Sequence, residues 1–371
     1  MRTRQAGMSL VEVLVAVAIG LIGILIITKA YLTSDSFNRS TVGEGSAQTN
    51  GTIALFTIER DVRQAGYGIA DSRIMGCANI NWFYDPNYSA NLGGTLPNIT
   101  LAPVVITQTP GAPDSITVMY SSEATRLIAG TLTAPMPLPS SELNVDGTYG
   151  YTVGDKVLLV SDTTPTTCTL EQITTLQPSA SKMQHNPGTT APYNPSGGGL
   201  FPAYGKDSLV IDMGNPVVRT YQIANGNLQL ADTMLIAGGG APTDVVDGIV
   251  DLRAEYGKDD GVNNGTVTNT TYTANDGIID SFDNVAPVTA ADWSQVLAVR
   301  VAVLARIDNY EKPSVSGGNC DATTVMPSWS GSAADPFTAI DVATATSQDR
   351  CFRYRVFETT IPLRNMIWRA S

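Results

Sequence analysis

The sequence Gly7-Met8-Ser9-Leu10-Val11-Glu12 opens an apolar stretch that continues to Ile27. From residue 8 to residue 27 the chain is mostly Val, Leu, Ile, Ala and Gly. These roughly 20 residues are enough for a helix to cross a hydrocarbon core of about 30 Å. Glu12 is the one charged residue inside the stretch. A carboxylate in a membrane helix costs up to about 3 kcal/mol near the bilayer centre, so Glu12 predicts a functional role and a positively charged partner.

Residues 1–7 form a short basic leader in front of this stretch. Arg2 and Arg4 hold the N-terminus in the cytoplasm by the positive-inside rule, which places everything after Lys29 on the far side of the membrane. The apolar stretch is longer than the core of a typical signal peptide and has no small-x-small cleavage site at its far end. Cleavage after Gly7 would release the α-amino group of Met8, a cation close to Glu12 in the chain.

This N-terminus resembles that of a type IV prepilin, whose signature is a basic leader, a glycine at the cleavage site and a glutamate at the fifth mature position. The resemblance implies that a prepilin peptidase cleaves after Gly7 on the cytoplasmic face and methylates the new amino group of Met8. Most members have Phe where this chain has Met8; we expect the change to be tolerated, because Gly7 and the apolar run define the cut. An ordinary signal anchor with a stray Glu12 is the alternative.

Composition limits what the rest of the chain does. The chain has 371 residues and a net charge of −12, and such an acidic protein is poorly suited to neutralising nucleic-acid phosphates, so we expect no nucleic-acid partner. About 300 residues follow the helical region, enough for one large or two small domains.

All four cysteines, Cys77, Cys168, Cys320 and Cys351, lie in the exported part, where oxidation is expected, so we expect two disulfides. Four cysteines allow three pairings. We favour Cys77 with Cys168 and Cys320 with Cys351, because the second pair closes a loop of about 30 residues and would contribute roughly 3 to 4 kcal/mol through loop-closure entropy. A peptide map linking Cys77 to Cys351 would overturn this choice.

Helical periodicity continues beyond the membrane stretch. We expect a transmembrane part at residues 8–28 and an amphipathic arm at residues 29–66, in which apolar residues recur three, four and seven apart. They are Ala47, Ala54, Leu55, Ile58, Val62 and Ala65. Gly66 and Gly68 predict the end of the helix. The glycines at positions 20, 23, 43, 45 and 51 predict a bent or locally unwound helix.

From about Asn79 onward the pattern predicts β-strands, so the fold class is α+β: a long N-terminal helix packed on a β-rich head at residues 67–371. The head is either one unit or two sub-domains that meet near residue 245. Alternating or continuous apolar runs predict the strands, and Asn225-Gly226 predicts a hairpin turn. The expected strands are 116–120, 156–160, 208–211, the hairpin 221–230, 250–256, 297–307 and a last pair, 351–357 and 359–363.

Four stretches resemble PilW-type minor pilins: 58–68, 246–257, 293–306 and 353–365. The resemblance implies a pilin-like fold and a minor pilin that helps to assemble or prime a type IV pilus, with Glu12 paired to the N-terminus of a neighbouring subunit. It implies as partners the prepilin peptidase, other minor and major pilins and the inner-membrane assembly platform. The expected location is the inner membrane, by a single span with the head in the periplasm, and then the pilus fibre. A type II secretion pseudopilin shares the N-terminal signature and is the nearest alternative.

An enzyme is not expected, because no Gly-x-Ser-x-Gly, Walker, Cys-x-x-Cys or His-Glu-x-x-His motif is present. The single histidine, His185, lies in a Pro- and Gly-rich segment, which indicates a solvated loop residue rather than a catalytic or metal-binding one. A tip adhesin is a further alternative. Its binding surface would be the aromatic residues Trp82, Phe83, Tyr84 and Tyr88, which are more simply explained as packed near Cys77.

The loop between Tyr256 and Phe282 is rich in Asp and Asn, whose oxygens are suitable ligands for calcium. Its spacing is not that of an EF-hand. If calcium binds, Asp276 and Asp280 are the ligands we expect first. The alternative is a solvated loop in which Asp and Asn side chains form Asx-turns. No other cofactor is expected.

Overall fold

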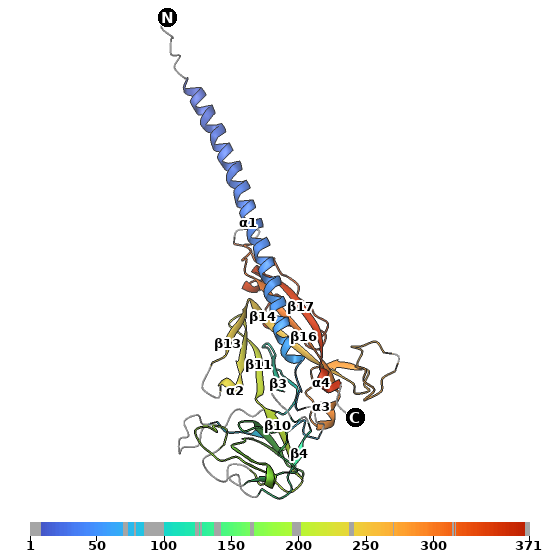
Figure 1. Cartoon of the computed structure of the whole chain (residues 1–371). Coiled ribbons are helices and arrows are strands. Elements are labelled where there is room, and N and C mark those ends of the chain that lie inside the picture. Colours follow the sequence, from blue (N-terminus) through green and yellow to red (C-terminus); the bar gives the residue numbers. More distant parts are fainter. Residues whose placement is uncertain are drawn as a thin grey trace.

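A long helix stands out of a β-rich head in the computed structural model of the chain (Figure 1). The structure describes residues 9–69, 73–77, 79–84, 100–122, 126, 128–136, 142–163, 167–194, 202–236, 241–269, 271–313, 315 and 317–367. The expected α+β class, with one long N-terminal helix on a large β-rich head, is confirmed.

Helix α1, Leu10–Val62, runs without interruption for 53 residues. Its first half is exposed, whereas Ala47, Ala54, Ile58 and Val62 on its second half are buried against the head, as the periodicity predicted. The predicted local unwinding at the glycines is wrong, because the helix continues through all of them, and Figure 1 shows no sharp bend in α1.

Two of these glycines serve close packing instead. A Cβ atom on Gly51 would overlap the Phe357 ring, and one on Gly43 would lie 2.8 Å from a methyl group of Ile307. Glycine at these two positions therefore lets α1 approach the strands that carry Phe357 and Ile307. At Gly45, by contrast, no described atom of the head lies within 4 Å of the position that a Cβ would occupy.

The Gly51→Ala substitution is therefore expected to destabilise the protein. The new methyl group overlaps the Phe357 ring, and forcing atoms into a packed interface costs about 1 to 3 kcal/mol. The matched control is Gly45→Ala on the exposed side of the same helix, where alanine should stabilise the helix by up to about 1 kcal/mol. The measurement is denaturant unfolding of the full chain in detergent; equal midpoints for the two variants would contradict the packing role of Gly51.

The strands of the described residues form four sheets. The C-terminal sheet has the order β15 (Ser281–Asp283), β14 (Ile249–Lys258), β16 (Val296–Ile307) and β17 (Arg353–Pro362). The central sheet has the order β13 (Thr243–Asp247), β12 (Asn227–Asp232), β11 (Pro216–Ala224), β3 (Ser115–Ser121) and β2 (Val104–Thr107). The distal sheet has the order β1 (Asn79–Asn81), β7 (Thr167–Gln172), β6 (Lys156–Val160), β10 (Leu209–Gly214) and β4 (Gly130–Thr131). A small sheet joins β5 (Leu143–Asn144), β9 (Lys182–Gln184) and β8 (Thr175–Gln177).

Short helical turns complete the described elements. They are η1 (Pro178–Ala180), α2 (Thr233–Ile236), α3 (Ala290–Ser294), η2 (Gln348–Cys351) and α4 (Arg364–Ile367). The distal sheet lies at the end of the head farthest from the free end of α1 (Figure 1).

One hydrophobic core joins α1 to the central and C-terminal sheets. Leu228, Val246 and Ile249 lie on both sides of position 245 and belong to this same core. A boundary near residue 245 therefore does not separate two cores. A second part of the head does have its own core, built from residues that lie between β3 and β11 in the sequence, including Leu132, Val157 and Val210. The distal part of the head is thus largely an insertion between two neighbouring strands of the central sheet.

The strand predictions agree with the structure except at the C-terminus. The hairpin of β11 and β12 turns at Asn225 and Gly226, which both have positive φ, 54° and 75°. The predicted last pair of strands is wrong: β17 is one continuous strand, whose register with β16 runs unbroken from Pro362 to Arg353. No glycine or proline separates the two predicted segments, so nothing in that part of the chain favours a turn.

The two disulfides are Cys77–Cys168 and Cys320–Cys351, the pairing favoured from the sequence. The first joins the segment before β1 to β7, and the second closes the loop that precedes β17. Trp82 and Phe83 are buried, and Tyr84 packs against Tyr193 with ring centroids 5.2 Å apart. Tyr88 lies outside the described residues. Trp82, Phe83 and Tyr84 therefore do not form the exposed surface that an adhesin would need.

Candidate functional site

The N-terminus of α1 carries Glu12 in an arrangement that local residues dictate. Ser9 is the N-cap: its Oγ accepts a hydrogen bond from the Glu12 N–H at 3.3 Å, and Glu12 Oε2 accepts one from the Ser9 N–H at 3.0 Å. This reciprocal pair is a capping box, which satisfies two N–H groups that a helix end leaves without partners. The expected processing residues Gly7 and Met8 lie outside the described residues.

The capping box was missed in the sequence, although Ser9 and Glu12 have the readable Ser-x-x-Glu spacing. It shows that Glu12 has a partner within its own chain. Because that partner is a neutral N–H, the negative charge of the carboxylate is not neutralised by it. In an apolar environment the carboxylate would therefore still need a counter-ion or a proton.

The first half of α1 is not buried by any part of the chain that the structure describes. The apolar side chains from Leu10 to Ile27 are exposed, and α1 is the helix among the described residues that is long and apolar enough to cross a membrane. Exposed apolar area of this extent marks a surface that contacts lipid or other proteins.

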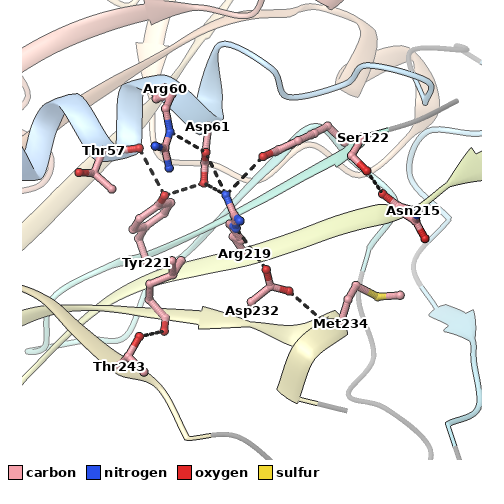
Figure 2. Close-up of polar contacts among 12 residues, drawn as sticks. Thr57, Arg60, Asp61, Ser122, Asn215, Arg219, Tyr221, Asp232, Met234 and Thr243 are labelled. Atoms are coloured by element: carbon pink, nitrogen blue, oxygen red, sulfur yellow. Dashed lines mark hydrogen bonds and ion pairs between the residues drawn. The ribbon is translucent and has the colours of Figure 1, made fainter. Parts of the chain in front are cut away.

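The second half of α1 is fixed to the head by a buried polar network around Asp61, shown in Figure 2. The Asp61 side chain is 1% exposed, and Arg219 Nη1 lies 3.1 Å from its Oδ2. The Tyr221 hydroxyl donates to the same Oδ2 at 2.6 Å. Arg219 Nε also donates to Asp232 at 3.2 Å, and the exposed Arg60 approaches Asp61 at 3.5 Å.

This network joins three elements, since Asp61 lies on the last turn of α1, Arg219 and Tyr221 on β11, and Asp232 on β12. Burial, and then the hydrogen bond to Asp61, raise the pKa of Tyr221. The hydroxyl therefore stays protonated and keeps donating. The end of the helix is also held by Asn365, whose Nδ2 donates to the carbonyl oxygens of Gln64 and Ala65 at 3.1 and 3.0 Å. The Asp61 network and the Asn365 hydrogen bonds thus hold the head on the second half of α1 in one orientation.

The sequence could not predict the Asp61 network. Asp61 and Arg219 are 158 positions apart, and each looks like an ordinary surface charge next to other charged residues. The only local signal is that Asp61 directly precedes the buried Val62 on the apolar side of the arm.

The acidic loop uses its carboxylates as acceptors for backbone N–H groups. Asp276 Oδ1 accepts from the Ile278 N–H at 2.9 Å, and Asp280 Oδ2 accepts from the Gly261 N–H at 2.8 Å. Asp259 accepts from the N–H groups of Asp276 and Gly277. Contacts of this kind correspond to the alternative to a calcium site, a loop in which Asp and Asn side chains bind backbone N–H groups. The described residues hold no group of three or more His, Cys, Asp or Glu side chains placed to bind a metal ion.

His185 differs from the sequence-based expectation. It is buried, with Nδ1 3.3 Å from Oε2 of Glu171, so the expectation of a solvated loop residue was wrong. The reason is that the residue follows β9, which folds back onto β8 and packs the segment inward. Burial raises the pKa of the Glu171 carboxyl well above its usual range. Both side chains are closed to solvent, so this pair offers no accessible catalytic site.

Two family models match parts of the chain. The prokaryotic N-terminal methylation motif matches residues 2–28, and the family described as type IV pilus-assembly protein W, PilW, matches residues 218–365. A type IV-like pilin from Thermus thermophilus has 11% sequence identity over 85% of this chain and 95% of that one, with a TM-score of 0.29. The search of curated proteins gave no match.

The methylation motif on a long apolar helix, joined to a β-rich head, is an arrangement similar to that of type IV prepilins. The chain is PilW-like over residues 218–365, less than half of its length. The PilW match spans most of β11, which carries Arg219 and Tyr221, and the whole C-terminal sheet.

Proposed function

We propose that this chain is a membrane-anchored minor pilin that takes part in assembling or priming a type IV pilus and has no catalytic activity. The observation that carries the proposal is the division of α1 into an exposed apolar half that bears Glu12 and a half locked onto the head. A helix built this way can be stored in a membrane and later packed among other helices while the head stays outside.

In the proposed mechanism, the peptidase cleaves after Gly7 and methylates Met8 while the helix lies in the inner membrane and the head lies in the periplasm. Extraction into the fibre then moves the apolar half of α1 from lipid to neighbouring helices. Glu12 pairs with the N-terminal amino group of an adjacent subunit, and this contact sets the axial register. The partners are other minor and major pilins and the inner-membrane assembly platform.

The second half of α1 also offers a contact surface for those partners. Phe56 and Ile53 are 64% and 45% exposed on the part of the helix whose opposite side is buried against the head. Apolar side chains with this exposure on an otherwise packed helix favour contact with a neighbouring subunit.

The proposal is tested in cells that lack the chain. We expect few or no surface pili, restoration by the wild-type chain, and only a few copies per fibre by quantitative mass spectrometry of sheared pili. A photo-crosslinking residue at position 56 should capture other pilins, whereas one at the distal Tyr149, which is 94% exposed, should not. Normal piliation together with lost secretion of exported enzymes would indicate a type II secretion pseudopilin instead.

A further inference from the structure

Arg253 lies buried in the head among three carboxylates. Its Nε lies 3.1 Å from Asp251 on the same strand, β14, and its Nη1 lies 3.4 Å from Asp114 and 3.1 Å from Asp335. The side chains of Arg253 and Asp335 are 4% and 8% exposed, and those of Asp114 and Asp251 are 0% exposed. One guanidinium cannot balance three buried negative charges. A state in which all three carboxyl groups are ionised would therefore be strongly unfavourable.

The three carboxylates differ in how well they are satisfied. Asp251 Oδ2 accepts from the N–H groups of Thr338 and Ala339 at 2.8 and 2.9 Å. Asp114 Oδ2 accepts from the Ala254 N–H at 3.1 Å. Asp335 Oδ2 is buried and has no hydrogen-bond partner among the described residues.

The other charged groups near the cluster are already engaged. Glu255 on β14 pairs with Arg300 of β16 at 2.8 Å, so Arg300 is not available to balance Asp335. The Tyr256 hydroxyl accepts from the Ile106 N–H at 2.6 Å. The remaining way to lower the negative charge is to bind a proton. Asp114 Oδ1 and Asp335 Oδ1 lie 3.4 and 3.1 Å from the same nitrogen, Arg253 Nη1, so the two carboxylates are close neighbours. Two carboxylates can form a hydrogen bond only if one of them carries a proton.

Asp335 belongs to a long segment that covers one face of the C-terminal sheet. Trp329, Phe337, Ile340 and Val342 pack on Val250, Ala302 and Leu304 of β14 and β16. This cover, residues 329–342, is held by the contacts of Asp335, Thr338 and Ala339 with the Arg253 cluster. Trp329 Nε1 also donates to the backbone oxygen of Asp335 at 2.8 Å.

We propose that Asp114 and Asp335 share one proton beside Arg253, and that loss of this proton loosens the cover at residues 329–342 and exposes the apolar face of the C-terminal sheet. The head would then present an apolar surface to other proteins only when the surrounding pH is high enough. This inference concerns the isolated chain and does not depend on the proposed role in the pilus.

The direction of the pH effect follows from Asp114. Burial, and then the charge of Asp335, raise its pKa to about 7 from an ordinary value of 3.8, against the opposing effect of Arg253. Between these two values the folded chain holds a proton that the unfolded chain has released. The associated stability is fully present below about pH 4 and is lost as the pH rises through 7.

The test is hydrogen–deuterium exchange of the full chain in detergent at pH 6 and pH 8, corrected for the intrinsic pH dependence of exchange. We expect opening of residues 329–342 to become about tenfold more frequent at pH 8, with no such change in the hairpin of β11 and β12. Trp329 fluorescence should change over the same range. If residues 329–342 of the wild-type chain are equally protected at both pH values, the proposal is overturned, and no variant is needed to show it.

Substitutions separate the shared proton from a general effect of pH. In the D335N chain an amide donor permanently replaces the shared proton, so the cover should stay protected at pH 8. D321N removes an exposed carboxylate from the same long segment and should keep the wild-type pH dependence. If D335N folds and still opens tenfold between pH 6 and pH 8, Asp335 does not hold the proton and the proposal fails.

Discussion

A Glu12→Val chain is expected to insert into the membrane and to be cleaved after Gly7, but to be nearly absent from assembled pili. Valine suits a membrane helix better than glutamate, so insertion should not suffer. In the fibre, however, the substitution removes the only negative charge that the apolar half of α1 can offer to a neighbouring N-terminal amino group. Two unit charges 4 Å apart attract by about 1 kcal/mol in water and by about 4 kcal/mol at the effective dielectric of a protein. The loss of that attraction should remove the preference for one axial register.

The capping box makes a second variant informative. Ser9→Ala removes the side-chain acceptor for the Glu12 N–H, which costs about 1 kcal/mol of helix stability, but it keeps the charge of Glu12. If charge pairing matters, Ser9→Ala chains should enter pili at close to the wild-type level, measured as the ratio of this chain to the major pilin in sheared fibres. Similar loss of both variants would instead indicate that the capped helix end, and not the charge, is recognised. Wild-type levels of the Glu12→Val chain in pili would rule out the register role.

Sequence reasoning succeeded where the signal is local. The length and periodicity of residues 8–66, the Asn225-Gly226 turn and the alternation in β14 and β16 each lie within one short window, and the structure contains the corresponding elements. The helix glycines were misread for the same reason. In the sequence a glycine such as Gly51 only weakens a helix, and its use becomes visible when Phe357, far away in the chain, is placed against it.

Contacts between distant segments could not be predicted. The distal part of the head lies in the sequence between β3 and β11, which pair with each other. Nothing in the sequence of either strand indicates that its partner lies so far away in the chain. The Pro- and Gly-rich neighbours of His185 predict a solvated residue, yet the fold buries it beside Glu171 of β7, a strand of a different sheet from β9. The Asp61 and Arg253 clusters share this property: each combines charges that look solvent-exposed until the fold brings them together.

The Asp61→Ala substitution is expected to cause a large loss of stability at the helix–head junction. It leaves the partly buried Arg219 without its main counter-ion and the Tyr221 hydroxyl without its 2.6 Å acceptor. Breaking a buried ion pair by removing one partner costs about 3 to 5 kcal/mol. Arg219 keeps Asp232 and is 27% exposed, so we expect about 3 kcal/mol, a large share of the roughly 5 to 15 kcal/mol that stabilises a typical domain.

Two matched variants divide this effect into its parts. Tyr221→Phe removes one hydrogen bond to a charged group and should cost about 1.5 to 3 kcal/mol, whereas Arg60→Ala removes only the exposed partner and should cost no more than about 1 kcal/mol. Denaturant unfolding of the full chain in detergent measures all three. A loss for Asp61→Ala no greater than that for Arg60→Ala would show that the network does not hold the head.

If the expected order is found, the Asp61→Ala chain should also be poorly incorporated into pili despite an intact Glu12. A head that is free to move on α1 cannot present Phe56 and Glu12 to neighbouring subunits in one fixed geometry.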